Sequence, residues 1–234
     1  MAFGKRINEK GKLMLYVLAT PIGNLGDISE RARRILADAD IIIAENPVHS
    51  MKILEHLGIG EKKFVQFAEH NEHSALPKVV EILKMSDAVL MSDAGTPGIS
   101  DPGFRVVRAA IAENINVIPI PGPSAAIAAL CASGLPTDKF VFLGFLPKTE
   151  IKLNKELEKI EQLEATAIFY ESPHRVLKTL GFIKKCWPQA HLALARELTK
   201  IHEEFLRGTA EKIELELKKR PAIKGEFTIL INFK

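Results

Sequence analysis

A stretch rich in glycine and proline, residues 92–103, constrains the fold more than any other part of the chain. It follows the uninterrupted apolar residues 88–91, which predict a buried strand, and precedes Val106, Val107, Ala110 and Ile111 at helical spacing. A plain strand-to-helix connection needs only about 2–6 residues. Loops of this kind at the carboxyl ends of strands are where open α/β sheets bind small molecules. We therefore interpret residues 92–103 as a ligand-binding loop rather than a turn kept only for folding.

The first half of the chain alternates between short apolar runs and helical patterns. We expect strands at residues 13–19, 41–44, 64–67, 88–91 and 117–120, with helices between them, which is typical of a parallel sheet. Asp27 and Glu30 are spaced like the capping box of the first helix. The dense prolines of residues 119–124 mark a boundary. The pattern predicts an N-terminal α/β domain, residues 13–120, and a C-terminal one, residues 121–234.

The second half has a different order of elements. Residues 125–132 are apolar on every side, which predicts a helix buried between layers. Strands are expected at residues 140–145, 166–170, 192–195, 202–206 and 227–233, with a charged helix near residues 152–163 and another opened by Ser172-Pro173. The crowding of strands towards the end predicts a mixed sheet with antiparallel members. The fold class is therefore α/β with two α/β domains.

Composition narrows the environment and the class of ligand. The 234 residues carry a formal net charge of +3, which permits contact with phosphates without requiring it. Two cysteines far apart, Cys131 and Cys186, suit a reducing compartment and provide no thiolate metal site. Lys5, Arg6, Lys10 and Lys12 precede a short apolar run that reads better as the first strand than as a signal peptide. No apolar run approaches the roughly 20 residues that span a bilayer, so we expect a cytoplasmic protein without membrane contact.

Four turn-like segments follow predicted strands of the first half, at residues 20–24, 45–47, 92–103 and 121–125. The carboxyl ends of parallel strands lie along one edge, so these segments should converge on one cleft. The chain has no G-x-G-x-x-G, and Gly95-Thr-Pro-Gly98 lacks the lysine of a P-loop. A dinucleotide dehydrogenase or an NTPase is therefore disfavoured, and a ligand held by backbone groups is favoured.

Six ordered motifs carry a resemblance to a known family. They are Leu15-Tyr-Val-Leu-Ala-Thr-Pro-Ile-Gly-Asn-Leu25, Ser92-Asp-Ala-Gly-Thr-Pro-Gly-Ile-Ser-Asp-Pro-Gly103, Pro121-Gly-Pro-Ser-Ala125, Gly144-Phe-Leu-Pro147, Phe169-Tyr-Glu-Ser-Pro-His-Arg175 and Ala195-Arg-Glu-Leu-Thr-Lys200. The chain resembles the ribosomal RNA small-subunit methyltransferase I family of tetrapyrrole-methylase-like, S-adenosylmethionine-dependent enzymes. The resemblance implies two domains of the tetrapyrrole methylase type with a cofactor cleft between them, and a homodimer. It also implies methylation of a cytidine ribose 2′-hydroxyl in 16S rRNA of the 30S subunit.

The resemblance also implies a set of site residues. The neighbours of S-adenosylmethionine would be Pro21, Asp93, Ala94, Gly95, Ile99, Ser124, Ala125, Tyr170 and Ala195. The acceptor side is argued from chemistry instead, because methyl transfer needs a side chain that removes a hydroxyl proton. The candidates are Glu69, His70, Glu72, His174 and, as the preferred catalytic set, Glu171, Arg196, Glu197 and Lys200. Plainer readings stay open: a turn cap for Asp93, a helix cap for His174, and a solvated salt-bridged face for Arg196 and Lys200. Residues 69–73 lack the HExxH order, so no metal is expected.

Two departures from the family pattern bear on the acceptor. Family members usually read Ala-Glu-Asp-Thr-Arg after the second strand, whereas this chain reads Ala44-Glu-Asn-Pro-Val48, and it stops soon after Lys224-Gly-Glu226 where the family commonly has an extension. Two alternatives therefore remain besides rRNA methylation. One is a methylase of a small tetrapyrrole or another non-RNA acceptor, and the other is an inactive module that binds cofactor and RNA.

Overall fold

The computed structural model describes residues 13–234, and the chain separates into two compact units, Met1–Pro123 and Ser124–Lys234. The basic residues Lys5, Arg6, Lys10 and Lys12 lie outside the described residues. Within the described part of the chain, no helix is both long and apolar enough to cross a bilayer. Each unit contains one five-stranded sheet and is described by itself.

The sheet of the first unit is entirely parallel, with strand order β3-β2-β4-β1-β5. Its strands are β1 (Met14–Leu18), β2 (Ile41–Ala44), β3 (Lys63–Gln66), β4 (Ala88–Met91) and β5 (Asn116–Ile120). The helices are α1 (Glu30–Asp38), α2 (Pro47–His56), α3 (Glu72–Leu83) and α4 (Phe104–Ala112), with a short 3₁₀ turn at Leu25–Asp27. The predicted parallel sheet is therefore confirmed.

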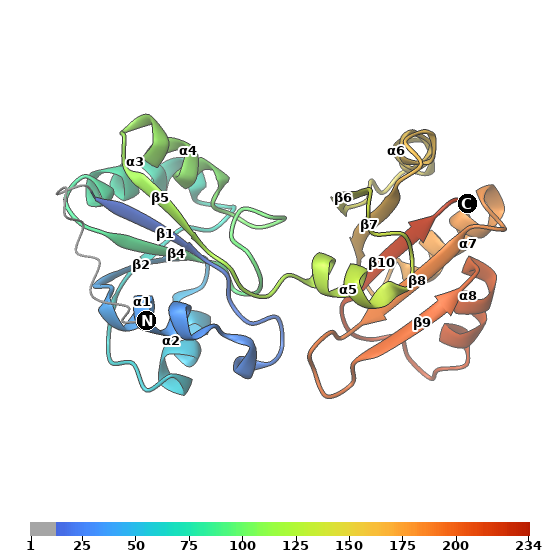
Figure 1. Cartoon of the computed structure of the whole chain (residues 1–234), viewed down its shortest axis with the longest axis horizontal. Helices are drawn as coiled ribbons and strands as arrows, with labels where there is room; N and C mark the ends of the chain where they lie inside the picture. The colour runs from blue at the N-terminus through green and yellow to red at the C-terminus, as the bar shows by residue number, and fades with distance from the viewer. Residues whose placement is uncertain (1–12) are drawn as a thin grey trace. The chain divides into compact units, whose positions relative to one another are not determined.

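Two apolar layers sandwich this sheet, with α3 and α4 on one face and α1 and α2 on the other (Figure 1). Leu15 and Leu90 belong to the core under α3 and α4, whereas Leu18 and Ile42 belong to the core under α1 and α2. Because both faces are buried, the strands consist of nearly continuous apolar residues. The chemistry of this unit is therefore confined to the ends of the strands.

The start of α1 differs from the expectation. The N-cap of α1 is Ser29, whose hydroxyl oxygen accepts a hydrogen bond from the backbone N–H of Ala32 at 3.1 Å, and Asp27 lies in the preceding 3₁₀ turn. The predicted capping box at Asp27 and Glu30 is therefore wrong. Pro119 lies inside β5, and this is tolerated because β5 is an edge strand of its sheet.

The second unit has a mixed sheet with strand order β6-β7-β10-β8-β9. Its strands are β6 (Phe140–Phe145), β7 (Thr166–Glu171), β8 (His191–Arg196), β9 (Glu204–Gly208) and β10 (Phe227–Asn232). The β6–β7 pair is parallel and the remaining pairs are antiparallel. The predicted mixed sheet is confirmed.

Helices cover both faces of the second sheet. The helices α6 (Glu150–Gln162), α7 (Val176–Cys186) and α8 (Ala210–Lys218) share one apolar core with the sheet. The apolar helix α5 (Ala125–Ser133) packs against β7, β8 and β10. Arg207 on β9 donates hydrogen bonds from its guanidinium to the carbonyl oxygens of Ala132 and Ser133, and so holds the last turn of α5. Cys131 and Cys186 are free thiols.

Candidate functional site

The loops that follow β1, β2, β4 and β5 are joined to one another at the carboxyl edge of the first sheet. Thr20 and Gly95 exchange two backbone hydrogen bonds, of 2.8 and 3.1 Å. The Asn46 N–H donates to Oδ1 of Asp93 at 3.2 Å, and the Thr96 hydroxyl donates to the Pro123 carbonyl oxygen at 3.4 Å. The expected convergence of these segments is confirmed within the first unit, through residue 123.

Gly95 is placed where the loop backbone requires a glycine. Its φ of +81° lies in the left-handed region, which side chains with a Cβ atom rarely adopt. The Gly95 carbonyl oxygen also accepts hydrogen bonds from the hydroxyls of Ser92, at 3.2 Å, and Thr20, at 3.4 Å. The loop is thus fixed by its own polar groups, while the neighbouring Ala94 remains exposed.

Three carboxylates gather at this edge, those of Glu45, Asp93 and Asp101. Burial, with Glu45 and Asp93 as further causes, raises the pKa of Asp101 from 3.8 to about 6, although a hydrogen bond with Ser92 opposes the shift. Burial likewise raises the pKa of Glu45, helped by Asp93 and Glu69. Sequence reasoning missed Asp101. The sequence did contain a signal for it. Asp101 lies in the same loop as Asp93 after β4, and β4 is adjacent to β2, which Glu45 follows.

The other predicted cofactor neighbours of the first unit lie close to the same loops. Pro21 is buried and directly follows Thr20, which is bonded to Gly95. Asp93 is partly buried, and its carboxylate accepts the Asn46 N–H rather than capping a turn of its own loop. Ile99 belongs to the same loop and is exposed. The structure therefore brings Pro21, Asp93, Ala94 and Gly95 together at one edge.

Asn46-Pro47-Val48 forms the start of α2. The Asn46 side-chain oxygen accepts the N–H groups of Val48, at 3.1 Å, and His49, at 3.4 Å, and Pro47 occupies the first helical position. Asn and Asp are about equally good N-caps, and proline suits the first turn. The side chain of residue 46 is thus engaged by the helix, whereas Val48 is 61% exposed.

The motifs of the second half also meet at one sheet edge. Phe227, the first residue of β10, pairs with both Glu171 at the end of β7 and Arg196 at the end of β8. The Arg175 guanidinium donates to the carbonyl oxygens of Leu146, at 3.2 Å, and Pro147, at 3.1 Å, which follow β6. Arg175 therefore ties two motif segments together, a role that the sequence did not indicate.

Glu171 is buried and fully engaged within its unit. One carboxylate oxygen accepts the Ser172 N–H at 2.8 Å and lies 3.6 Å from Nε of Arg175, and the other accepts the Thr179 hydroxyl at 2.6 Å. These partners favour a structural role in holding the turn that leads into α7. A catalytic role for Glu171 stays a prediction.

The predicted cofactor neighbours of the second unit differ in exposure. Tyr170 is partly buried, and its ring packs edge-on against Phe142 and Phe145, with centroids 5.0 and 5.7 Å away. Ala195 is fully buried in β8. Ser124 is the N-cap residue of α5, which begins at Ala125. The Ser124 side chain makes no capping hydrogen bond.

Arg196, the last residue of β8, and Lys200, in the loop after it, both form ion pairs, with different carboxylates. The Lys200 ammonium contacts Glu197 at 2.9 Å and Glu226 at 3.1 Å, and Arg196 lies 3.7 Å from Glu204. Both cations are thus paired, as the plainer reading of a salt-bridged face expected. Their contact with RNA stays a prediction.

The remaining acceptor-side candidates have separate surroundings. Glu72 forms an ion pair with Arg105 at 2.9 Å, whereas Glu69, His70 and His174 are exposed. Among residues 13–234, no group of three or more His, Cys, Asp or Glu residues is arranged to hold a metal ion. Glu69 and His70 nevertheless act electrostatically on Glu45 at the first sheet edge, where Glu69 raises the pKa of Glu45 and His70 lowers it.

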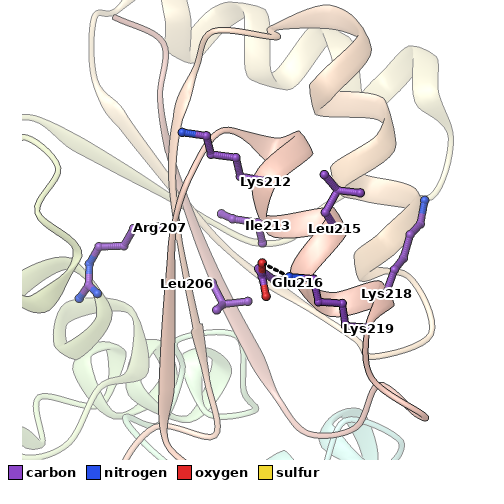
Figure 2. Close-up of a pocket in the computed structure, with 8 residues that line it drawn as sticks. All are labelled: Leu206, Arg207, Lys212, Ile213, Leu215, Glu216, Lys218 and Lys219. Atoms are coloured by element: carbon purple, nitrogen blue, oxygen red, sulfur yellow. Dashed lines mark hydrogen bonds and ion pairs between the residues drawn. The ribbon is translucent and has the colours of Figure 1, made fainter.

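A hollow of about 620 Å³ lies between β9 and α8 of the second unit (Figure 2). It is lined by Leu206, Arg207, Lys212, Ile213, Leu215, Glu216, Lys218 and Lys219. No residue of the predicted site is among them, and Lys219 is paired with Glu216 at its rim. This hollow is therefore distinct from the two sheet edges that gather the motifs.

Comparison with known proteins identifies the family. The family model of the tetrapyrrole (corrin/porphyrin) methylases matches residues 14–214. The chain belongs to the tetrapyrrole methylase family. A solved diphthine synthase has the same fold, with a TM-score of 0.71. The two chains are 14% identical, and the match covers 95% of this chain and 90% of that one. The methyltransferase CobJ gives a TM-score of 0.68 and 17% identity over 95% and 94% of the two chains.

Closer relatives of this tetrapyrrole methylase carry the name ribosomal RNA small subunit methyltransferase I. The protein of Halalkalibacterium halodurans is 45% identical over 96% of this chain and 76% of its own length. That of Hydrogenobaculum sp. is 43% identical over 94% of this chain and 96% of its own length. The resemblance that the six motifs indicated is confirmed.

Proposed function

We propose that this protein uses S-adenosylmethionine to methylate the ribose 2′-hydroxyl of a cytidine in 16S rRNA of the small ribosomal subunit. One observation carries the proposal. Relatives named ribosomal RNA small subunit methyltransferase I match at 43–45% identity over 94–96% of the chain, and so across both units. The acceptor class comes from their name, and the cytidine 2′-hydroxyl from the motif resemblance. A cytoplasmic location follows from a ribosomal acceptor.

The residues at the first sheet edge fit the proposed cofactor. S-Adenosylmethionine carries a sulfonium and an ammonium group, and both are cations that the carboxylates of Glu45, Asp93 and Asp101 would stabilise. The fixed backbone around Gly95 lets main-chain groups approach a nucleoside without side-chain interference. We assign cofactor contacts to this edge and, from the second unit, to Ser124, Ala125 and Tyr170, whereas Ala195 is fully buried in β8 and is not accessible to a ligand.

The cofactor supplies an electrophilic methyl group, so transfer breaks a carbon–sulfur bond, forms a carbon–oxygen bond and releases the hydroxyl proton. That proton passes to a general base within hydrogen-bond reach of the hydroxyl. Arg196 and Lys200 are the cations proposed to contact RNA phosphate, and Glu171 holds the turn beside them.

Methyl transfer to 30S particles that lack the modification tests the proposal. Tritiated S-adenosylmethionine is incubated with the protein and these particles, and the labelled nucleotide is then mapped by digestion. We expect label in 16S rRNA at a ribose 2′-oxygen, and none with 50S particles or with particles already modified. Labelling of a tetrapyrrole instead of 30S would contradict the proposal, as would cofactor binding without any transfer.

The homodimer implied by the resemblance is part of the same proposal. Light scattering of the purified protein measures its mass directly. We expect twice the chain mass of 25.9 kDa. A mass of one chain at micromolar concentration would contradict the dimer without affecting the proposed reaction.

A further inference from the structure

The loop after β8 has a backbone that its own residues do not favour. Glu197 has a φ of +51° and Thr199 a φ of +66°, so two residues with branched or long side chains occupy the left-handed region. Such conformations persist only where the surroundings determine them, and they cluster at functional sites. The contacts that impose this conformation therefore indicate what the loop is built to hold.

Most of these contacts come from residues 224–226, nearly thirty positions later in the chain. The Glu197 N–H donates to the Glu226 carbonyl oxygen at 3.0 Å, and the Glu226 N–H donates to Oε1 of Glu197 at 2.9 Å. Arg196 adds a hydrogen bond from Nε to the Lys224 carbonyl oxygen at 2.7 Å. The side chain of Glu197 is thus bound to a backbone amide as well as to Lys200.

Gly225 allows this close approach. It has a φ of +101°, and a Cβ atom at this position would lie 2.6 Å from Cγ and 2.9 Å from Cδ of Glu197. A Cβ atom essentially never lies so close to another heavy atom, so any larger residue at position 225 would displace Glu197. Glycine at position 225 and the placement of Glu197 therefore depend on each other.

The two carboxylates that contact Lys200 differ in freedom. Glu197 is 19% exposed in its side chain and fixed by the Glu226 N–H, whereas the Glu226 side chain is 81% exposed. An anion that approaches Lys200 can displace the exposed carboxylate more easily than the fixed one. Glu197 therefore holds Lys200 in place, whereas Glu226 is a partner that an incoming anion can replace.

Both members of the fixed pair are ionised at neutral pH. Burial alone would raise the pKa of Glu197, but hydrogen bonds from Lys200 and the Glu226 N–H outweigh it and bring this pKa below its usual value. Burial alone would lower the pKa of Lys200, but hydrogen bonds to Glu197 and Glu226 raise it above the usual value. Lys200 is thus a permanent cation and does not act as a general base.

We propose that Glu197 is a positioning residue that fixes the Lys200 ammonium for a phosphate of the RNA acceptor, and that Glu226 occupies Lys200 until that phosphate displaces it. The inference rests on the proposed function. A cation whose side chain is already ordered loses less conformational entropy when it binds an anion. Glu197 thus contributes to RNA affinity although its own charge repels phosphate.

Charge-neutralising variants at the two glutamates separate positioning from plain electrostatics. Removing a carboxylate next to a phosphate contact strengthens RNA binding if only charge matters, so Glu197→Gln and Glu226→Gln would then act alike. If Glu197 positions Lys200, the two variants should change the Kd in opposite directions. We expect Glu226→Gln to lower the Kd for unmodified 30S particles, and Glu197→Gln to raise it by about 3- to 10-fold, the usual cost of ordering one long side chain.

Gly225→Ala provides a variant that changes no charge. It displaces Glu197 and should raise the Kd as Glu197→Gln does, whereas Gly58→Ala should leave it unchanged. Gly58 also has a positive φ, of +66°, but no neighbouring atom lies within 4 Å of the place that a Cβ atom would take there, so it controls for a substitution at a positive φ without crowding. Equal thermal unfolding of Glu197→Gln and wild type would show that the loss is not one of folding.

Salt dependence identifies the cation. Lys200→Ala should weaken the slope of log K against log salt by about 0.7–0.9, the value of one phosphate contact. Glu197→Gln should keep the wild-type slope because Lys200 remains. Lys212→Ala, which removes an exposed lysine at the separate hollow of Figure 2, should change neither slope nor affinity.

The outcomes distinguish this inference from the proposed function. Wild-type protein that binds and methylates 30S particles, combined with a Glu197→Gln variant that binds as tightly as Glu226→Gln, would overturn the positioning role alone. Wild-type protein that neither binds nor methylates these particles would overturn the proposed function as well. If Gly225→Ala does not fold, the opposite signs of the two glutamine variants still decide.

Discussion

Thr20 and Gly95 lie 75 residues apart in sequence and exchange both of their backbone hydrogen bonds, at 2.8 and 3.1 Å. The pair makes one rigid piece of the loops that follow β1 and β4, two adjacent strands in the middle of the first sheet. Additional hydrogen bonds from the hydroxyls of Thr20 and Ser92 to the Gly95 carbonyl oxygen reinforce it. A ligand at this edge therefore meets a preformed backbone.

Gly95→Val should abolish binding of S-adenosylmethionine. Its φ of +81° costs a non-glycine residue about 1–3 kcal/mol, and a β-branched side chain also enters the space next to Ile22. Calorimetric titration of both proteins measures the effect. Gly58→Val carries similar backbone strain in open surroundings and should retain binding. Undiminished binding by Gly95→Val would remove residues 92–103 from the cofactor site.

Asp101→Asn should change how stability depends on pH. The pKa of Asp101 is about 6 in the folded protein and near 3.8 in the unfolded chain, so between these values the folded state holds a proton that the unfolded state has released. Wild-type stability therefore falls as pH rises from about 4 to 6, and the variant lacks this contribution.

Thermal unfolding across that pH range measures the difference. The stability of the variant relative to the wild type should increase from pH 4 to 6, and the difference should stay constant above pH 6. Asp40→Asn, which removes an exposed carboxylate of the same unit, is the matched control. Parallel stability profiles for wild type and Asp101→Asn would show that Asp101 titrates normally.

Thr179→Val should destabilise the second unit by about 1–3 kcal/mol, because one oxygen of the buried Glu171 carboxylate would lose its hydrogen-bond donor. Trp187 is the single tryptophan of the chain and packs between Phe182 and Phe233, so its fluorescence reports denaturant unfolding of this unit. Thr149→Val is the control, since Thr149 starts α6 without a side-chain capping bond. An equal effect of both variants would contradict the role given to Thr179.

Val48→Arg should strengthen binding to unmodified 30S particles. Of the three residues that depart from the family pattern, Asn46 and Pro47 serve the start of α2, and Val48 has the exposed side chain. An arginine there can bind phosphate bidentately and should steepen the salt slope by about 0.7–0.9. Met85→Arg, at another exposed site just after α3, controls for added charge. Equal effects of both variants would place residue 48 away from the RNA.

Apolar runs and helical spacing were sufficient to predict both sheets, because the central strands are buried and therefore consist mostly of apolar residues. The capping box failed for a local reason. Asp27 and Ser29 are both good N-caps, and the preceding 3₁₀ turn places Ser29 at the helix start. Spacing alone does not distinguish two such candidates.

The parts of the site that sequence reasoning missed depend on contacts distant in sequence. Asp101 acquires its raised pKa from burial, from Glu45 at the end of β2, and from Asp93 in its own loop. Glu197 adopts a positive φ without being glycine, and its partner Gly225 lies far along the chain. The sequence predicted a site at the ends of the strands, but the contacts between residues distant in sequence could be found only from the fold.

Helix α5 has a consequence for dividing this protein into fragments. It packs on a sheet face that includes β7 and β10, where Ile168 and Leu230 are fully buried, and Arg207 of β9 binds its last turn. A fragment that begins at Phe140 would contain every strand of the second sheet and still expose that apolar face to water. Such a fragment should aggregate, whereas one that begins at Ser124 keeps the face covered. A fragment of the second unit should therefore include α5, although this helix precedes every strand of the sheet that it covers.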